Sequence, residues 1–343
     1  MDKKKLFTDI FSIAKVVTPA LVTEGVYERM FHHHLFYFRP LWFGMDDFPD
    51  LTRERHTFYS YSKNLLVGYV YQCKTGTKKG IFVFAHGFGG GGHHRYLDLI
   101  HAICERGYYV FAYDATANDE SEGHTMKGFT QGLLDADKAI GYVEALKEYE
   151  KLPLYLCGHS WGAYSVSAAI GWHPRVKGLI AYSGFNSSTG IFKANGERYA
   201  GEKADEFMAY VDSYEKLLFG DIYESTAIDA FHASKAKICI IQSDDDRTVP
   251  IEVGLNLYKQ EFKNDKRFLF IKLLTRGHGT VYYSPNGKKY YDTLMKSYET
   301  FIKKTKPHDE QKAEYLNTHI DRKRFNNMID EKVLDKALSF ITK

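Results

Sequence analysis

Residues 154–172 read LYLCGHSWGAYSVSAAIGW, and this stretch decides the fold. An apolar run of strand type, LYLC, leads into Gly158-His159-Ser160-Trp161-Gly162, and a helix is expected over 161–172. A serine on so tight a strand-to-helix turn takes strained backbone angles. The chain also passes so close to the helix that positions 158 and 162 must lack side chains. Free amides at the helix N-terminus favour negative charge beside the Ser160 oxygen. The pattern predicts a nucleophile at Ser160; the alternative is a glycine-rich turn with a bystander serine.

The same rhythm of strand, loop and helix continues on both sides of this turn. Apolar runs of strand type are IFVFA (81–85), YYVFAYD (108–114), VKGLIAYS (176–183), KICIIQ (237–242) and RFLFIKLL (267–274). Helices are expected at 93–106, 126–150, 251–262 and 288–304. Continuous apolar strands that alternate with helices predict a mostly parallel sheet, buried on both faces and flanked by helices. Upstream, residues 53–73 read as two strands joined by a turn at 62–64.

Three further segments surround this α/β body, which we place at 53–306. Residues 1–52 are expected to form an N-terminal extension with helices at about 6–17 and 20–38 and a stretch dense in aromatic residues. Residues 307–343 form a helical tail. An acidic and aromatic insertion at about 185–234 carries one helix face with Phe207, Val211, Tyr214 and Leu218. An insertion after a strand of a parallel sheet lies over the carboxyl ends of the strands, where ligands bind, so we predict a helical lid.

Composition narrows the class of protein. Forty-six Lys and Arg against 43 Asp and Glu leave a net charge of +3, without the gathered basic excess of a nucleic-acid binder. No uninterrupted apolar run approaches the ~18 residues needed to span a bilayer. The four cysteines, Cys73, Cys104, Cys157 and Cys239, are far apart and are expected to be reduced core thiols. We therefore expect a cytoplasmic, soluble protein whose 26 Tyr and 24 Phe suit a core and a lipophilic pocket.

Two loops after later strands carry the partners that a serine nucleophile needs. The loop 243–250 reads SDDDRTVP, and a carboxylate there can orient a histidine. Asp244, Asp245 and Asp246 compete for this role; the alternative for the first two is a solvated loop or a helix cap. In Arg276-Gly277-His278-Gly279, the glycines let the histidine swing over a pocket. The chain order of serine, acid and histidine favours His278 over His308 and His319, which lie in the tail.

The loop that begins at His86-Gly87-Phe88, after the strand IFVFA, supports the same chemistry. Acyl transfer needs amide donors aimed at the tetrahedral oxyanion, one just after the nucleophile and one from a loop after an earlier strand. The backbone N–H groups of Trp161 and Phe88 are the candidates for this oxyanion hole. His86, Gly87, Gly158, His159 and Gly162 are predicted to support it.

Together these motifs resemble the α/β-hydrolase family. His86-Gly87-Phe88, the pentapeptide at 158–162, Asp246-Arg247-Thr248-Val249-Pro250 and Gly277-His278 are similar to its oxyanion loop, nucleophile elbow, acid loop and histidine loop. The Asp-x-x-Val-Pro form selects Asp246 among the three aspartates. Residues 114–123 are similar to a loop of the serine aminopeptidase-like branch, which includes esterases and monoacylglycerol lipases. The resemblance covers about 58–304 and implies the α/β-hydrolase fold. One departure is Ser243, where the family often has glycine.

Other functions compete with this interpretation. Gly87–Gly92 with Asp114 also fits a dinucleotide-binding fingerprint, which a run of glycines satisfies cheaply. Histidines 32–34, or His86 with His93 and His94, offer a metal site, although consecutive helical residues point ~100° apart. The family resemblance also leaves open a serine peptidase and a non-catalytic binding protein. We predict a carboxylesterase with catalytic Ser160, Asp246 and His278, no cofactor, no metal, and a small acyl ester with an apolar group as substrate. The oligomeric state is not predicted.

Overall fold

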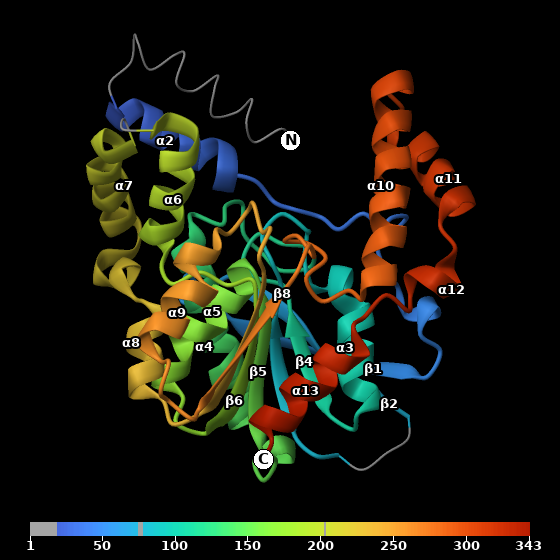
Figure 1. The fold of residues 1–343 in the computed structure, drawn as a ribbon, viewed down its shortest axis with the longest axis horizontal. Helices are drawn as coiled ribbons and strands as arrows, with labels where there is room; N and C mark the ends of the chain where they lie inside the picture. The colour runs from blue at the N-terminus through green and yellow to red at the C-terminus, as the bar shows by residue number, and fades with distance from the viewer. Residues whose placement is uncertain (1–18, 75–77, 202–203) are drawn as a thin grey trace.

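The computed structural model describes residues 19–74, 78–201 and 204–343. The helix expected over 6–17 lies outside these residues. Within them, eight strands form one sheet in the order β1-β2-β4-β3-β5-β6-β7-β8. The strands are β1 (Leu51–Tyr59), β2 (Leu65–Cys73), β3 (Ile81–Ala85), β4 (Tyr109–Tyr113), β5 (Leu154–His159), β6 (Val176–Tyr182), β7 (Lys237–Ser243) and β8 (Phe268–Leu273). The pairs β1–β2 and β2–β4 are antiparallel and the other pairs are parallel, so the sheet is mostly parallel, as predicted (Figure 1).

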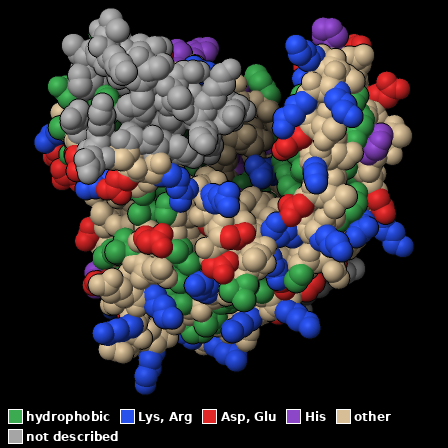
Figure 2. All heavy atoms as spheres, turned by 45° about the horizontal axis from the view of Figure 1, so that its top comes forward, with side chains coloured by type: hydrophobic (Ala, Val, Ile, Leu, Met, Phe, Trp, Pro, Cys, Tyr) green, Lys and Arg blue, Asp and Glu red, His purple; other side chains and the backbone are tan. Residues whose placement is uncertain are grey.

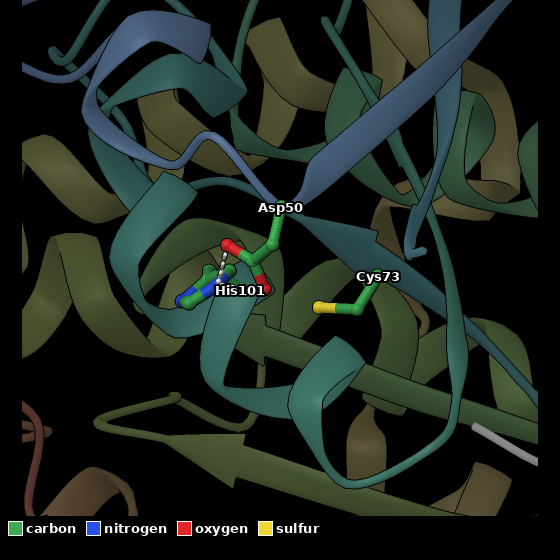
Figure 3. Close-up of side chains that lie close together, drawn as sticks. All are labelled: Asp50, Cys73 and His101. Atoms are coloured by element: carbon green, nitrogen blue, oxygen red, sulfur yellow. Dashed lines mark hydrogen bonds and ion pairs between the residues drawn. The ribbon is translucent and has the colours of Figure 1, made fainter. Parts of the chain in front are cut away.

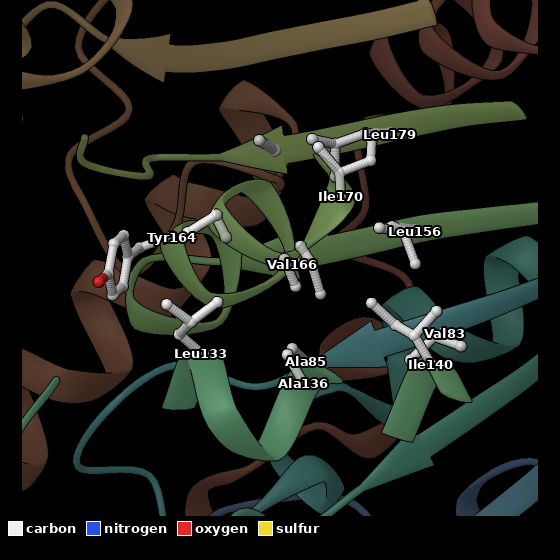
Figure 4. Close-up of a cluster of buried hydrophobic side chains, with 14 of the residues drawn as sticks. Val83, Ala85, Leu133, Ala136, Ile140, Leu156, Tyr164, Val166, Ile170 and Leu179 are labelled. Atoms are coloured by element: carbon white, nitrogen blue, oxygen red, sulfur yellow. The ribbon is translucent and has the colours of Figure 1, made fainter. Parts of the chain in front are cut away.

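Alternation along the strands builds a core on each face of the sheet. In β3, Ile81, Val83 and Ala85 belong to one buried cluster, whereas Phe82 and Phe84 belong to the other. Side chains of successive residues in a strand point to opposite faces, so a continuous apolar run fills both cores. Figure 4 shows the first cluster, in which strand residues such as Leu156 meet residues of two helices, among them Ile140 and Val166.

Helices cover the two faces in two sets. The first face carries α4 (Phe129–Ala145), α5 (Trp161–Ala169), α8 (Ala227–Ala233) and α9 (Leu255–Glu261). The second carries α3 (Leu97–Glu105), α10 (Pro285–Thr305) and α13 (Glu331–Ile341). Short 3₁₀ helices are η1 (Met45–Asp47), η2 (His93–Tyr96), η3 (Lys147–Tyr149), η4 (Ile170–Trp172), η6 (Gly220–Glu224) and η7 (Ile251–Val253). Helices on both faces of a largely parallel sheet form a doubly covered α/β architecture.

The predicted helices differ from the observed ones in their bounds, and at three of them the structure shows where the helix gives way. The helix expected over 20–38 is α2 (Pro19–Phe31), because the following segment leaves the helix and Leu35 bridges to Asn118. The helix expected over 126–150 is shortened to α4, since Lys127 has a φ of 55° and Gly128 is extended. The helix expected over 93–106 begins as η2 and becomes α-helical at Leu97.

The insertion at 185–234 forms α6 (Ser188–Ala200), α7 (Ala204–Phe219), η6 and α8. Figure 1 shows α2, α6 and α7 grouped beyond one end of the sheet, and we call these three helices the roof. Glu215 of α7 is fully buried there and accepts hydrogen bonds from Tyr27 Oη (2.5 Å) and Thr130 Oγ1 (2.9 Å). Burial raises the pKa of Glu215, although the hydroxyl donors oppose this shift.

Both ends of the described chain pack into the body. Phe31 and Tyr27 of α2 belong to the first core, and Phe43 to the second. Strand β1 begins at Leu51, two residues before the start that we predicted for the α/β body. After α10 the tail forms α11 (Asp309–His319), α12 (Arg322–Phe325) and α13. Helix α13 lies so close to the sheet that a Cβ on Gly178 would come within 2.7 Å of the Ile341 Cβ.

Two predictions about the chain as a whole concern cysteines and membranes. All four cysteines are free and buried. Among the residues that the structure describes, no helix has the length and apolar character needed to cross a bilayer.

Candidate active site

The turn between β5 and α5 holds Ser160 in a strained conformation. Its φ is 55° and its ψ is −119°, a region that residues with a side chain rarely adopt. The two glycines of the pentapeptide allow this approach. A Cβ on Gly158 would come within 2.6 Å of the Gly162 carbonyl, and one on Gly162 would overlap the carbonyl of Ala85. The steric reason predicted for glycine at both positions is therefore present in the structure.

The structure brings Ser160, Asp246 and His278 together from the loops that follow β5, β7 and β8. His278 Nε2 lies 2.8 Å from Ser160 Oγ, and His278 Nδ1 lies 2.7 Å from Asp246 Oδ2. These distances fit an imidazole that donates from Nδ1 to the carboxylate and accepts the hydroxyl proton at Nε2. Ser160 is 8% exposed, so the hydroxyl is nearly enclosed. This geometry matches a nucleophile, a base and an orienting acid.

Asp246 is held as a carboxylate by its surroundings. Its side chain is inaccessible to solvent, and Oδ1 accepts hydrogen bonds from the backbone N–H groups of Thr248 and Val249, both at 2.9 Å. Burial alone raises the pKa of Asp246. The hydrogen bond and charge of His278, with the two amides, outweigh burial and lower that pKa below its ordinary value. The carboxylate is therefore ionised where it faces the imidazole.

The two other aspartates of the acid loop have a role that the sequence did not reveal. Asp244 Oδ1 accepts a hydrogen bond from the Thr275 amide (2.9 Å), and Asp245 Oδ1 accepts one from the Gly277 amide (2.7 Å). Ser243, at the departure from the family pattern, donates to Asp245 and accepts from the Arg276 amide. Asp244 and Asp245 are exposed, as the alternative of a solvated loop implies, and neither contacts His278. They join the acid loop (243–250) to the histidine loop (274–279).

The glycine loop (86–92) is fixed beside Ser160 by buried histidines. His86 Nε2 accepts from the Ala115 amide (3.0 Å), so its Nδ1 carries the proton and donates to the Gly87 carbonyl (2.9 Å). Trp161 opens α5, and the first amides of a helix have no partner inside it. The Phe88 amide belongs to the glycine loop. Their roles as oxyanion donors stay predictions.

A hydrogen-bonded chain connects the glycine loop to the histidine loop through Tyr96, which the sequence analysis did not single out. Tyr96 Oη accepts from the Gly87 amide (3.1 Å) and donates to His159 Nδ1 (2.9 Å). His159 Nε2 then donates to the carbonyl of His278 (3.0 Å). Burial, together with the charges of His278 and Arg95, lowers the pKa of His159, so the ring is neutral. No sequence pattern signals Tyr96, because its contacts join segments far apart in the chain.

Aromatic rings cover one side of the candidate site. Phe88 packs edge-on against Phe31 (centroids 5.4 Å apart), Phe129 (5.5 Å) and Trp161 (5.8 Å). Phe192 of α6 adds a contact with Phe129 at 5.3 Å. These rings join the glycine loop to α4 and to the roof. They form an apolar wall beside Ser160.

The residues that the sequence offered for a dinucleotide site or a metal site form hydrogen bonds and ion pairs with other groups of the protein. Asp114 is fully buried, and its Oδ1 accepts from the amide (2.9 Å) and the Nδ1–H (2.7 Å) of His93, so it does not face a ribose. His86 bonds to Ala115, and His94 Nδ1 lies 3.0 Å from Asp119 Oδ2. His32 lies 3.5 Å from Glu28, its neighbour one helical turn away.

A different set of metal-ligating side chains lies near the amino end of β4. Ligand atoms of Asp50, Cys73 and His101 lie within 4.8 Å of one another (Figure 3). Cys73 ends β2, which runs antiparallel to β4. The cluster therefore lies at the amino ends of the parallel strands, whereas Ser160 follows the carboxyl end of β5. His101 Nε2 is 2.9 Å from Asp50 Oδ1, so a hydrogen bond already uses two of the three groups. The cluster is separate from the candidate active site.

Comparison with known proteins agrees with this architecture. Residues 76–194 match the family model described as serine aminopeptidase, S33. No curated protein matches the sequence. Among solved structures, an esterase of Pyrococcus furiosus superposes with a TM-score of 0.54 at 15% identity, over 79% of this chain and 97% of that one.

Two peptidases superpose over a smaller part of their own length. An acylaminoacyl peptidase of Pyrococcus horikoshii has a TM-score of 0.50 at 17% identity, over 74% of this chain and 42% of that one. A puromycin-hydrolyzing peptidase of Mycobacterium tuberculosis has a TM-score of 0.51 at 16% identity, with 67% and 36% covered. Identities this low show a shared fold. The chain therefore has the α/β-hydrolase fold, and across residues 76–194 it is similar to the serine aminopeptidase, S33, family.

Proposed function

We propose that the protein is a serine hydrolase that cleaves a carboxylic ester, or a related acyl bond, through an acyl-enzyme. The observation that carries this proposal is the contact of Ser160 Oγ with His278 Nε2 at 2.8 Å, while Asp246 holds the other ring nitrogen at 2.7 Å. A hydroxyl bonded to a base that a buried carboxylate orients is the arrangement of an activated nucleophile.

In the proposed reaction, Ser160 attacks the acyl carbonyl and His278 takes its proton. The Asp246 carboxylate stabilises the imidazolium, and the amides of Phe88 and Trp161 hold the oxyanion. The imidazolium then protonates the leaving oxygen. Water, activated by His278, releases the acid and restores Ser160. This sequence uses groups of the chain and water, without a metal or cofactor.

The aromatic wall favours an ester with an apolar acyl group. Phe88, Phe129 and Phe192 offer rings that desolvate such a group, and burial of apolar area contributes ~25 cal/mol per Å². The roof over these rings is proposed to act as a lid. A small-molecule substrate of this kind suits the enclosed Ser160.

A peptidase is the second candidate, and the description of the matching family model, serine aminopeptidase, favours it. The same triad would then release an amine in place of an alcohol. A binding protein that keeps the triad without turnover is the third possibility.

The test is hydrolysis of p-nitrophenyl esters, acetate through palmitate, with aminoacyl p-nitroanilides in parallel. We expect ester turnover with a chain-length optimum, and a loss on the order of 10⁶ in kcat for Ser160→Ala. Ser167→Ala, a buried serine on the same helix, is the matched control and should keep its activity. Turnover of the anilides alone would favour the peptidase. Activity that survives in Ser160→Ala would reject Ser160 as the nucleophile.

A further inference from the structure

Arg95 lies directly beside the candidate active site. It belongs to η2, just after the glycine loop. Its side chain packs so closely that a Cβ on Gly90 would come within 3.0 Å of Arg95 Cδ. At the other end of the side chain, a Cβ on Gly279 would come within 3.0 Å of Arg95 Nη2. Gly279 follows His278, so the guanidinium adjoins both the glycine loop and the histidine loop.

This guanidinium has no polar partner among residues 19–74, 78–201 and 204–343. Its Nε is buried without a hydrogen-bond acceptor. The group instead stacks over aromatic rings, 4.6 Å from the Trp42 centroid and 5.8 Å from that of Tyr96. Other half-buried arginines differ: Arg276 pairs with Asp330, and Arg322 donates to the carbonyls of Trp42 and Pro40. A partly buried cation without acceptors is costly, and it marks a place where a ligand can supply them.

The neighbouring acid does not neutralise Arg95. Asp98 lies three residues along the chain, and its carboxyl is outside ion-pair distance of the guanidinium while one oxygen accepts from the Leu99 amide. Burial raises the pKa of Asp98 to about 7, despite the opposing charge of Arg95. Much of this carboxyl is therefore protonated at neutral pH. The positive charge beside His278 remains uncompensated.

We propose that Arg95 binds an anionic oxygen group, a carboxylate or a phosphate, on the leaving-group part of the substrate. This inference rests on the proposed function. His278 Nε2 must protonate the leaving oxygen, so the leaving group lies on the side of Ser160 where His278, Gly279 and Arg95 are. The apolar wall of Phe88 and Phe129 is left for the acyl group. The proposed substrate is therefore an ester of an apolar acid with an anionic alcohol.

Basic side chains lie on this face of the molecule. Figure 2 shows a hollow beside the helix pair α10 and α11, with Lys and Arg side chains along it. Gly89, in the glycine loop, has no atom within 4 Å of the position that a Cβ would take.

The chemistry of the guanidinium also favours an anion. A bound anion supplies the hydrogen-bond acceptor that the buried Arg95 Nε lacks. A planar guanidinium also matches a carboxylate or phosphate with two parallel hydrogen bonds. The anion is therefore expected to raise kcat/KM.

The experiment compares two esters that differ in charge: 4-butyryloxy-3-nitrobenzoate and its methyl ester, which both release a coloured nitrophenol. The wild type should prefer the anionic ester. Arg95→Gln should lose roughly ten- to a hundred-fold in kcat/KM for the anionic ester and little for the neutral one. Arg95→Lys should keep part of the preference. Arg324→Gln, which removes an exposed arginine stacked on Tyr290, is the control and should change neither rate.

Each other outcome contradicts a specific claim. Equal losses on both esters in Arg95→Gln would mean a structural role and overturn the anion site. A wild type without preference would overturn it and leave the serine hydrolase standing. If the wild type hydrolyses neither ester, the proposed function fails for these esters, and binding decides the anion site. Titration of Ser160→Ala with 4-hydroxy-3-nitrobenzoate should then show saturation that Arg95→Gln abolishes, and no saturation would reject the site. Benzoate and phenyl phosphate as competitors distinguish the two anions; inhibition by neither would also reject it.

Discussion

The floor of the candidate site and the roof above it are held by different forces. We use floor for the Ser160 turn, the acid loop and the histidine loop. In the floor, backbone amides and carbonyls meet specific polar partners: Asp244 and Asp245 bond to amides of the histidine loop. In the roof, rings of α2 and α6 pack together, and one buried carboxylate, Glu215, joins α7 to α2 and α4. Directional bonds fix atoms to tenths of an ångström, whereas apolar packing fixes a surface and leaves its details adjustable.

The largest effect is expected in the floor, from Asp246→Asn. The asparagine oxygen still accepts the hydrogen bonds from the amides of Thr248 and Val249. The NH₂ group of the asparagine then faces His278 Nδ1. The ring must accept there, so Nε2 carries a proton and cannot accept one from Ser160. We expect kcat to fall roughly 10⁴-fold, with little change in the urea midpoint. Ester kinetics and urea unfolding measure the two quantities, and a kcat near that of the wild type would contradict the role of Asp246.

Gly162→Ala tests whether close approach alone holds the Ser160 turn. The new methyl group would overlap the Ala85 carbonyl, and backbone cannot move aside as a side chain can. We expect a loss of about 3 kcal/mol or more in the free energy of unfolding. Gly141→Ala in α4 is the matched control, because its methyl group meets no atom within 4 Å. That change should stabilise by about 0.5–1 kcal/mol. Equal urea midpoints for the two variants would refute the steric reason.

Tyr96→Phe removes the link between the glycine loop and the histidine loop. The Gly87 amide and His159 Nδ1 lose their buried partner, which costs about 1–3 kcal/mol in stability. We expect a fall of about tenfold in kcat, since the His278 carbonyl is held through His159. Tyr258→Phe is the control, as the buried Tyr258 hydroxyl has no partner among the described residues. If both variants behave alike in kinetics and in unfolding, the link has no role.

The smallest effect is expected in the roof, and its pH dependence is opposite to that of the floor. The pKa of Glu215 is raised, so its contribution to stability is present below its unfolded value near 4.5 and is lost as pH rises through the folded value. The pKa of Asp246 is lowered, so its contribution is lost as pH falls through the folded value. Above pH 4.5, the free energy of unfolding of the wild type should fall as pH rises. Glu215→Gln should reduce this fall by about 1 kcal/mol.

Limited proteolysis between 185 and 234 across this pH range measures the roof directly. Wild-type cleavage should become faster as pH rises above 4.5, and Glu215→Gln should remove that trend. Glu224→Gln, an exposed residue of the same insertion, should behave as the wild type does. A trend that persists in Glu215→Gln would show that another group controls the roof.

The fold is predictable from the sequence where structure is decided locally. Six of the eight strands follow from apolar runs, and the tight turn at Ser160 requires glycine at 158, where the chain approaches its near neighbour Gly162. What depends on distant segments is not predictable in this way. The end of α2 at Phe31 reflects a bridge from Leu35 to Asn118, and the uses of Asp244, Asp245 and Tyr96 depend on partners far along the chain. No local pattern marks such partners.

The packing of α13 has a consequence for how the protein matures during synthesis. Ile341 closes over Gly178 in the middle of the sheet, about 160 residues after it in the chain. The ribosome therefore makes the Ser160 turn long before α13, the last of the three helices that cover the opposite face of the sheet. His278 and Asp246 also follow late, so an incomplete chain carries the serine without its base. The nascent chain is expected to have no hydrolytic activity until its last third has been translated.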